Sequence, residues 1–133
     1  MPESFHCTLV TPEEQVFDEP VAHVTVPAWD GEVGLLWHRA PMLVKLGYGP
    51  LRLDLAGGQS RTYFVGGGFA QMKDDRLTLL TDEATPADQI DLKEAQAALN
   101  EALALRAIGA ESASKRDRDL ARARGMIAVA QAK

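Results

Sequence analysis

A run of three glycines is the first feature that could do chemistry, because a glycine-rich loop can cradle a phosphate group. The run Gly66–Gly68 lies between two predicted strands and is followed by neither a Lys-Ser/Thr pair nor a helix. The phosphate-loop and dinucleotide-binding patterns therefore both fail. We predict instead a tight corner between strands, where glycine lets two backbone segments approach closely.

Patterns typical of catalytic and metal sites are missing from the sequence. The histidines His6, His23 and His38 have no Cys or His partners at metal-ligand spacing. No Gly-x-Ser-x-Gly motif and no evident Ser/His/Asp constellation is present. We therefore expect no catalytic residue, no metal and no cofactor on this chain.

The segment from residue 30 to residue 43 is the best candidate for binding. Gly31 and Gly34 predict a sharp turn between strands, and Trp37, His38 and Arg39 follow as an aromatic and cationic cluster. Loops on a rigid β scaffold often present binding groups, and Trp and Arg are enriched at interface hot spots. The alternative is that Trp37 is a core residue.

The distribution of charge singles out the C-terminal end. The 133-residue chain has a net charge of −5, which argues against nucleic acid as its partner. Residues 82–111 hold seven acids and two bases, whereas residues 112–133 hold two acids and six bases. This change of sign predicts a tail with an electrostatic role of its own.

Cysteine content and hydropathy indicate a reducing, cytoplasmic setting. Cys7 is the sole cysteine, so no intrachain disulfide is possible, and its place in a predicted strand favours a buried, inert thiol. No stretch approaches the roughly 20 apolar residues that a membrane-spanning helix needs. The N-terminus lacks the charged and apolar regions of a secretion signal.

Up to about residue 81, the elements that must position these groups are strands. Short alternating segments are separated by turn signals rich in glycine, proline and aspartate, a pattern typical of an antiparallel sandwich. The predicted strands are 5–11, 23–27, 33–36, 43–46, 51–55, 62–65, 69–73 and 77–81.

After Pro86 the pattern predicts a helical hairpin of about 20 residues per arm. Asp91 and Glu94 have the spacing of a capping box, and Gly109 is placed as a helix terminator. We expect a linker over 109–113 and a second N-cap at Ser114. The apolar stripes are mostly alanine, and a methyl group buries little area. Weak packing leaves two options open: a mobile hairpin or a permanently docked cap.

The order of several short motifs resembles the epsilon subunits of F-type ATP synthases over essentially the whole chain. A Gly-Glu-x-Gly-Leu segment (31–35) is followed by Ala-Pro-Met (40–42), where the family has Ala-Pro-Leu. Gly-Pro-Leu (49–51) and Val-Gly-Gly-Gly-Phe (65–69) come next, and an alanine-rich helical hairpin ends the chain.

This resemblance implies an all-β sandwich of about ten strands, expected over 1–84, and a two-helix C-terminal domain, expected over 85–133. It implies a non-catalytic rotor subunit of a proton-translocating enzyme, peripheral at the cytoplasmic face of the bacterial plasma membrane. The sandwich would bind the gamma subunit and the c-ring. The helices would either fold against the sandwich or extend into the alpha/beta head and restrain ATP hydrolysis.

The resemblance also implies site residues. The loop expected to face the c-ring carries Glu32, Trp37, His38 and Arg39, with Arg39 at the family's usual histidine position. The basic second helix would meet an acidic segment of the beta subunit, and the alternative is a solvated helix face. Its matching residues are Lys115, Arg116, Arg118, Arg122 and Arg124.

ATP binding, which some family members show, is expected to be weak or absent. The family motif Ile/Leu-Asp-x-x-Arg-Ala is represented by Asp91 and Ala95, but Glu94 replaces the arginine. A glutamate would repel phosphate and suits a helix N-terminus. A nucleotide-sensing module remains the first rival hypothesis. The second is a small sandwich enzyme or ligand-binding protein with a helical cap, which would need an enclosed polar pocket.

Overall fold

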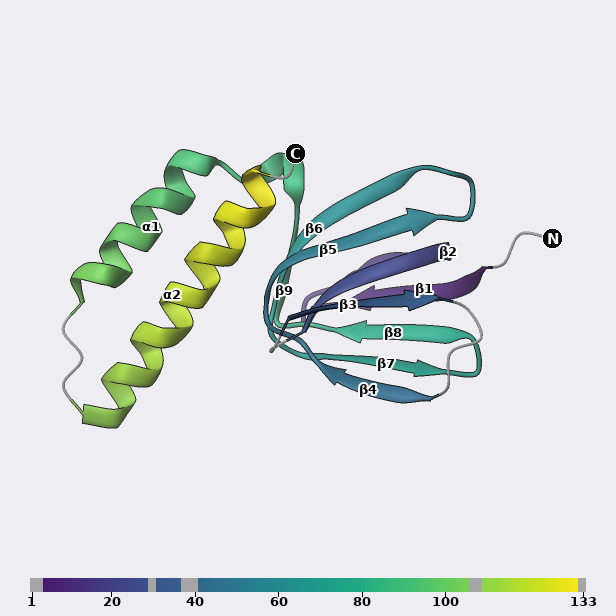
Figure 1. Ribbon diagram of the computed structural model, residues 1–133, viewed down its shortest axis with the longest axis horizontal. Coiled ribbons are helices and arrows are strands. Elements are labelled where there is room, and N and C mark those ends of the chain that lie inside the picture. The colour runs from purple at the N-terminus through teal and green to yellow at the C-terminus, as the bar shows by residue number, and fades with distance from the viewer. Residues whose placement is uncertain (1–3, 29–30, 37–40, 106–108, 132–133) are drawn as a thin grey trace.

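The computed structural model describes residues 4–28, 31–36, 41–105 and 109–131. Within these ranges, nine strands are followed by a short 3₁₀ helix and two α-helices (Figure 1). The predicted fold class, an all-β sandwich followed by a helical hairpin, is confirmed. The elements are β1 (Phe5–Val10), β2 (Gln15–Ala28), β3 (Gly31–Leu36), β4 (Met42–Lys45), β5 (Tyr48–Leu55), β6 (Ser60–Gly66), β7 (Phe69–Lys73), β8 (Arg76–Leu80), β9 (Glu83–Pro86), η1 (Ala87–Gln89), α1 (Leu92–Ala104) and α2 (Gly109–Gln131).

The strands follow the order β4-β7-β8-β1-β2-β5-β6-β9, with β3 also paired to β2. The long strand β2 joins the two halves of the sandwich, since its first part pairs with β1 and its second part with β3 and β5. Strands β1 and β8 run parallel, and the other neighbours are antiparallel.

Alternation along the strands fills the interior with apolar side chains. In β1, Phe5, Cys7 and Leu9 are buried and the residues between them are partly exposed. They join one core with residues of β8 and β5, including Leu79 and Leu53. Burial of apolar area is the main favourable term in folding, and every residue of this core precedes the helices, so we expect the sandwich to be stable without them.

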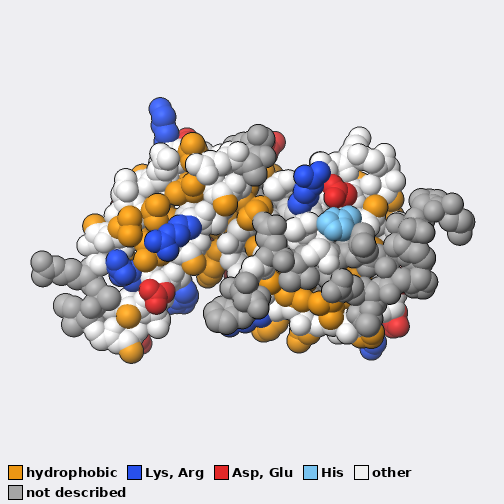
Figure 2. All heavy atoms as spheres, viewed as in Figure 1, with side chains coloured by type: hydrophobic (Ala, Val, Ile, Leu, Met, Phe, Trp, Pro, Cys, Tyr) orange, Lys and Arg blue, Asp and Glu red, His pale blue; other side chains and the backbone are white. Residues whose placement is uncertain are grey.

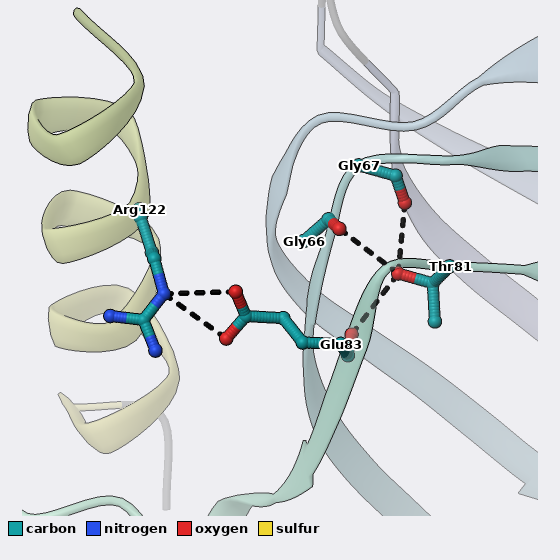
Figure 3. Close-up of polar contacts among 5 residues, drawn as sticks. All are labelled: Gly66, Gly67, Thr81, Glu83 and Arg122. Carbon is teal, nitrogen blue, oxygen red and sulfur yellow. Dashed lines mark hydrogen bonds and ion pairs between the residues drawn. The ribbon is translucent and has the colours of Figure 1, made fainter. Parts of the chain in front are cut away.

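The predicted glycine corner is confirmed between β6 and β7. Gly67 and Gly68 have φ angles of 72° and 100°, in the region that favours glycine. A Cβ on Gly68 would lie 1.9 Å from the Leu80 carbonyl oxygen, so the two backbone segments meet in contact. The Thr81 hydroxyl lies 2.8 Å from the Gly67 carbonyl oxygen and 3.0 Å from that of Glu83, which ties β8 and β9 to the corner (Figure 3).

The hairpin begins as predicted but turns elsewhere. The Asp91 side chain accepts a hydrogen bond from the Lys93 amide at 2.8 Å, which confirms the N-cap of α1. The predicted linker over 109–113 is wrong, because α2 already begins at Gly109. Ser114 is therefore inside the helix rather than its cap. The segment contains Ala110 and Ala113, and alanine has the highest helix propensity.

The largest differences from the predicted strands are at β2 and β9. Strand β2 starts at Gln15 rather than at His23, and β9 was not predicted. Of the two glycines of the predicted sharp turn, Gly31 begins β3 and pairs with Ala28 at the end of β2, whereas Gly34 lies inside β3. Neither described helix has the length and apolar character to cross a membrane.

Candidate functional site

One side of the sheet presents an ordered set of outward-pointing side chains. In β4, β7, β8 and β1, pairing brings Lys45, Phe69, Leu80 and Val10 into one row across the four strands. Leu43 points to the same side two residues before Lys45. We call the outward-pointing residues of these four strands the outer face.

The outer face is unusually apolar for a solvent-exposed surface. The exposed fractions are 68% for Leu43, 49% for Phe69 and 53% for Leu80. A shallow hollow of about 390 Å³ adjoins this row and is lined by Phe69, Leu80 and the chain around Pro12. Figure 2 shows hydrophobic side chains gathered over β4, at the lower edge of the sandwich. A contiguous exposed patch of this kind marks an interaction surface.

The far end of the outer face is polar and charged. Lys73 pairs with Arg76 across β7 and β8, and both are exposed. On β1, His6 and Thr8 both hydrogen-bond the carboxylate of Asp18 on β2. These bonds lower the pKa of Asp18 below its ordinary value, so the carboxylate stays ionised at neutral pH.

A second contact surface joins α2 to the sandwich. The Arg122 Nε donates to the two carboxylate oxygens of Glu83, at 2.9 and 3.1 Å (Figure 3). The guanidinium also lies 5.9 Å from the centroid of the Phe64 ring. The hydrogen bonds to Glu83 raise the pKa of Arg122 above its ordinary value, which keeps the group charged. The hairpin is therefore docked in this structure.

Comparison with known proteins now identifies the family. A family model described as the β-sandwich domain of the ATP synthase delta/epsilon chain matches residues 4–87. The ATP synthase epsilon chain of Rhodopirellula baltica is 44% identical over 124 residues, which are 93% of this chain and 96% of that relative. The chain belongs to the ATP synthase epsilon chain family. Membership makes it a non-catalytic stalk subunit, and the resemblance in the sequence is confirmed.

Further relatives match the chain over its helical C-terminal end as well. The epsilon chain of Chromohalobacter salexigens is 34% identical over 129 residues, 97% of this chain and 88% of that relative. A chain in the structure of the Euglena gracilis mitochondrial ATP synthase, OSCP/F1/c-ring in rotational state 1, is 28% identical with a TM-score of 0.84, covering 95% of this chain and 81% of its own length. The fold is shared with a chain in the structure of the Tetrahymena thermophila mitochondrial ATP synthase central stalk/c-ring. That chain is 18% identical with a TM-score of 0.65, and the match covers 96% of this chain and 94% of the other.

The residues expected to face the c-ring do not form one described loop. Glu32 lies near the start of strand β3, not in a loop, and Leu36 ends that strand. At about 3.3 Å per residue, these two positions are roughly 13 Å apart. Trp37, His38 and Arg39 lie outside the described residues.

The basic residues of α2 fall into two groups. Lys115 forms an ion pair with Asp119 at 2.7 Å within the helix, and Arg122 is committed to Glu83. Three others make no ion pair with any residue that the structure describes, and they lie at least partly exposed: Arg116, Arg118 and Arg124. Figure 2 shows Lys and Arg side chains standing out on the hairpin. This second group is available to an acidic partner.

Asp91 and Ala95, the two positions of the expected weak ATP site, both stabilise helix α1 or its packing. Asp91 caps the helix through its carboxylate, and Ala95 is fully buried. The hollow between α1 and α2 is lined by two acids, Glu101 and Asp119, as well as by Lys115 and Arg122. Such a balanced set of charges does not favour a polyphosphate.

Sequence reasoning missed the outer face. Leu79 and Leu80 are adjacent in a strand, so they point to opposite sides of the sheet. Only Leu79 is buried. A pair of neighbouring leucines in a predicted strand was therefore the signal that an apolar residue lies on the outside.

Proposed function

We propose that this chain is a rotor subunit of the central stalk in a proton-translocating ATP synthase. The sandwich couples rotation of the c-ring to the catalytic head through the gamma subunit. The helical hairpin regulates the complex by restraining ATP hydrolysis. In this division of labour, residues 1–84 carry coupling and residues 85–133 carry regulation. The complex holds the chain at the cytoplasmic face of the bacterial plasma membrane.

The exposed outer face is the observation that carries this proposal. A stalk subunit that transmits rotation must bind its partner through a rigid surface. The outer face is rigid because it lies on four hydrogen-bonded strands. Phe69 and Leu80 sit at its centre, and Lys73 and Arg76 sit at its charged end. An apolar centre beside charged residues is the usual anatomy of a protein interface. The gamma subunit binds here.

The other two partners occupy different parts of the molecule. The c-ring contacts an end of the sandwich, where Glu32 and the segment carrying Trp37, His38 and Arg39 supply polar groups. The alpha/beta head contacts the basic residues of α2. Complementary charge favours encounter and orientation there, because a positive helix meets an acidic segment. No ATP-binding step is part of this function.

Substitution of the outer face tests the gamma contact. We expect Phe69→Glu and Leu80→Glu each to weaken binding to purified gamma by about tenfold or more, since a buried carboxylate loses its hydration and an apolar contact is lost. Isothermal titration of gamma with each variant measures the effect. Both side chains are half exposed in the free chain, so the fold should persist.

The matched control is Gln59→Glu, which adds the same charge in the exposed turn between β5 and β6. We expect this variant to bind gamma like the unmodified chain. Unchanged affinity for both outer-face variants would remove the gamma assignment.

A further inference from the structure

The docked position of α2 depends on a small number of contacts with β5, β6, β9 and η1. Besides the ion pair between Arg122 and Glu83 and the packing of Arg122 over Phe64, the contact includes an apolar cluster. Its buried members are Phe64, Ile90 and Val129, and the partly buried residues packed against them are Tyr48, Ala87, Met126 and Ala130. This cluster is separate from the core of the sandwich. Individual changes at the contact can therefore alter docking without unfolding the sandwich.

Gly125 allows helix α2 to approach strand β5 closely. It is buried in the interior of α2, and a Cβ at this position would lie 2.8 Å from the carbonyl carbon and oxygen of Tyr48 and 3.0 Å from the amide nitrogen of Gly49. These neighbours are backbone atoms of β5, which cannot rotate away. Glycine weakens a free helix relative to alanine. At position 125 it therefore disfavours the isolated helix and permits the docked one.

Arg122 differs from the exposed arginines of the same helix. Its contact with Glu83 must break before it can bind a partner, whereas Arg118 and Arg124 make no ion pair with a described residue that would have to break. The side chains of Arg122 and Glu83 are 44% and 33% exposed, so carboxylates of a partner can reach and replace this contact. A ligand shifts a two-state equilibrium only by its differential affinity for the two states.

We propose that Arg122 and Gly125 form a latch that sets the balance between the docked and the released hairpin: the ion pair with Glu83 favours docking, and the glycine permits the close approach to β5 that docking requires. The released state rests on the proposed function, in which the hairpin leaves the sandwich. The latch itself is a property of the isolated chain. Arg116 does not line the hollow between α2 and β5, so it contributes to partner binding without affecting the latch.

Distances between spin labels on the isolated full chain test the latch. Labels are placed on cysteines introduced at two exposed positions, Gln59 in the sandwich and Leu103 in α1. The natural Cys7 can stay, since it is fully buried and burial raises its pKa to about 12. One narrow distance distribution is expected for the unmodified chain.

Two variants are expected to release the hairpin. Arg122→Glu replaces an attraction with a repulsion, and Gly125→Ala adds a clash while it strengthens the free helix. We expect the ratio of released to docked molecules to rise about fivefold or more in each. Arg116→Ala is the matched control, because Arg116 does not line the hollow between α2 and β5, and it should leave the distribution unchanged.

Exchanging the charges of Glu83 and Arg122 distinguishes loss of their ion pair from general destabilisation of the hairpin. Glu83→Arg alone should release the hairpin, and the double variant Glu83→Arg with Arg122→Glu should return the distribution toward that of the unmodified chain. Lack of rescue would overturn the role of the ion pair. An unchanged distribution in Gly125→Ala would overturn the role of the close approach. Both results are independent of gamma binding and of ATPase activity.

Discussion

Replacing Gly68 with alanine is expected to destabilise the sandwich by about 3 kcal/mol or more. The added Cβ would lie 1.9 Å from the Leu80 carbonyl oxygen and 2.8 Å from the Thr81 Cα. The φ angle of 100° adds strain for any residue with a side chain. Urea denaturation followed by circular dichroism measures the loss, which is a large fraction of the 5–15 kcal/mol of a typical domain.

This effect extends from stability to function. Gly68 directly precedes Phe69, and its clash is with Leu80, so both central residues of the outer face depend on the corner. The matched control is Gly57→Ala, because a Cβ there meets no atom within 4 Å. We expect the control to stay within about 0.5 kcal/mol of the unmodified chain. A loss below about 1 kcal/mol for Gly68→Ala would contradict the close approach of the two backbones.

Removal of the helical hairpin is expected to separate coupling from regulation. A chain ending at Asp91 keeps the sandwich core and Ile90, which covers Phe64, but loses both helices. We expect it to bind gamma like the full chain and to raise the ATPase activity of the assembled complex about twofold or more. The reason is that the basic residues that we propose to contact the head are gone.

A full-length variant provides the control for this truncation. Alanine at Arg116, Arg118 and Arg124 removes the exposed charges and leaves the latch of Arg122 and Gly125 in place. It should raise ATPase activity in the same direction without loss of any helix. Unchanged activity in both proteins would contradict the regulatory role and would leave gamma binding unaffected.

The sequence was sufficient to predict the sandwich, the hairpin and the corner at Gly66–Gly68, because these depend on local patterns. Alternation identified β1, and the capping aspartate Asp91 located the start of α1. The glycine run was correctly assigned to a corner, since the alternatives require a following helix. Such signals act over a few residues and survive in almost any tertiary context.

The missed parts depend on pairing between distant segments. Strand β9 has a polar, proline-ending sequence, and its pairing with β6 makes it a strand. The first half of β2 contains Pro20, which weakens the local signal, but it pairs with β1, with a register shift between Leu9 and Val10. Gly109 was taken for the end of a helix because glycine is common there, and it starts α2 instead.

For the same reason, only part of the candidate site could be predicted from the sequence. The basic residues of α2 could be recognised from their charge, but the pairing of Arg122 with Glu83 joins residues 39 apart in the chain. The outer face arises from the register of four strands, and local patterns indicate only one of its apolar residues, through the neighbouring pair Leu79 and Leu80. Gly125 lies inside a helix, where glycine lowers helix stability, and only the neighbouring backbone of β5 identifies it as a contact position.

Coupling is tested most directly by reconstitution. The complete ATP synthase is stripped of its own epsilon subunit and supplied with this chain, and ATP-driven proton pumping into vesicles is measured by fluorescence quenching. We predict that the unmodified chain restores pumping, whereas the chain carrying Phe69→Glu and Leu80→Glu does not. Pumping restored equally by both proteins, or by neither, would contradict the proposal that the outer face couples the rotor to gamma.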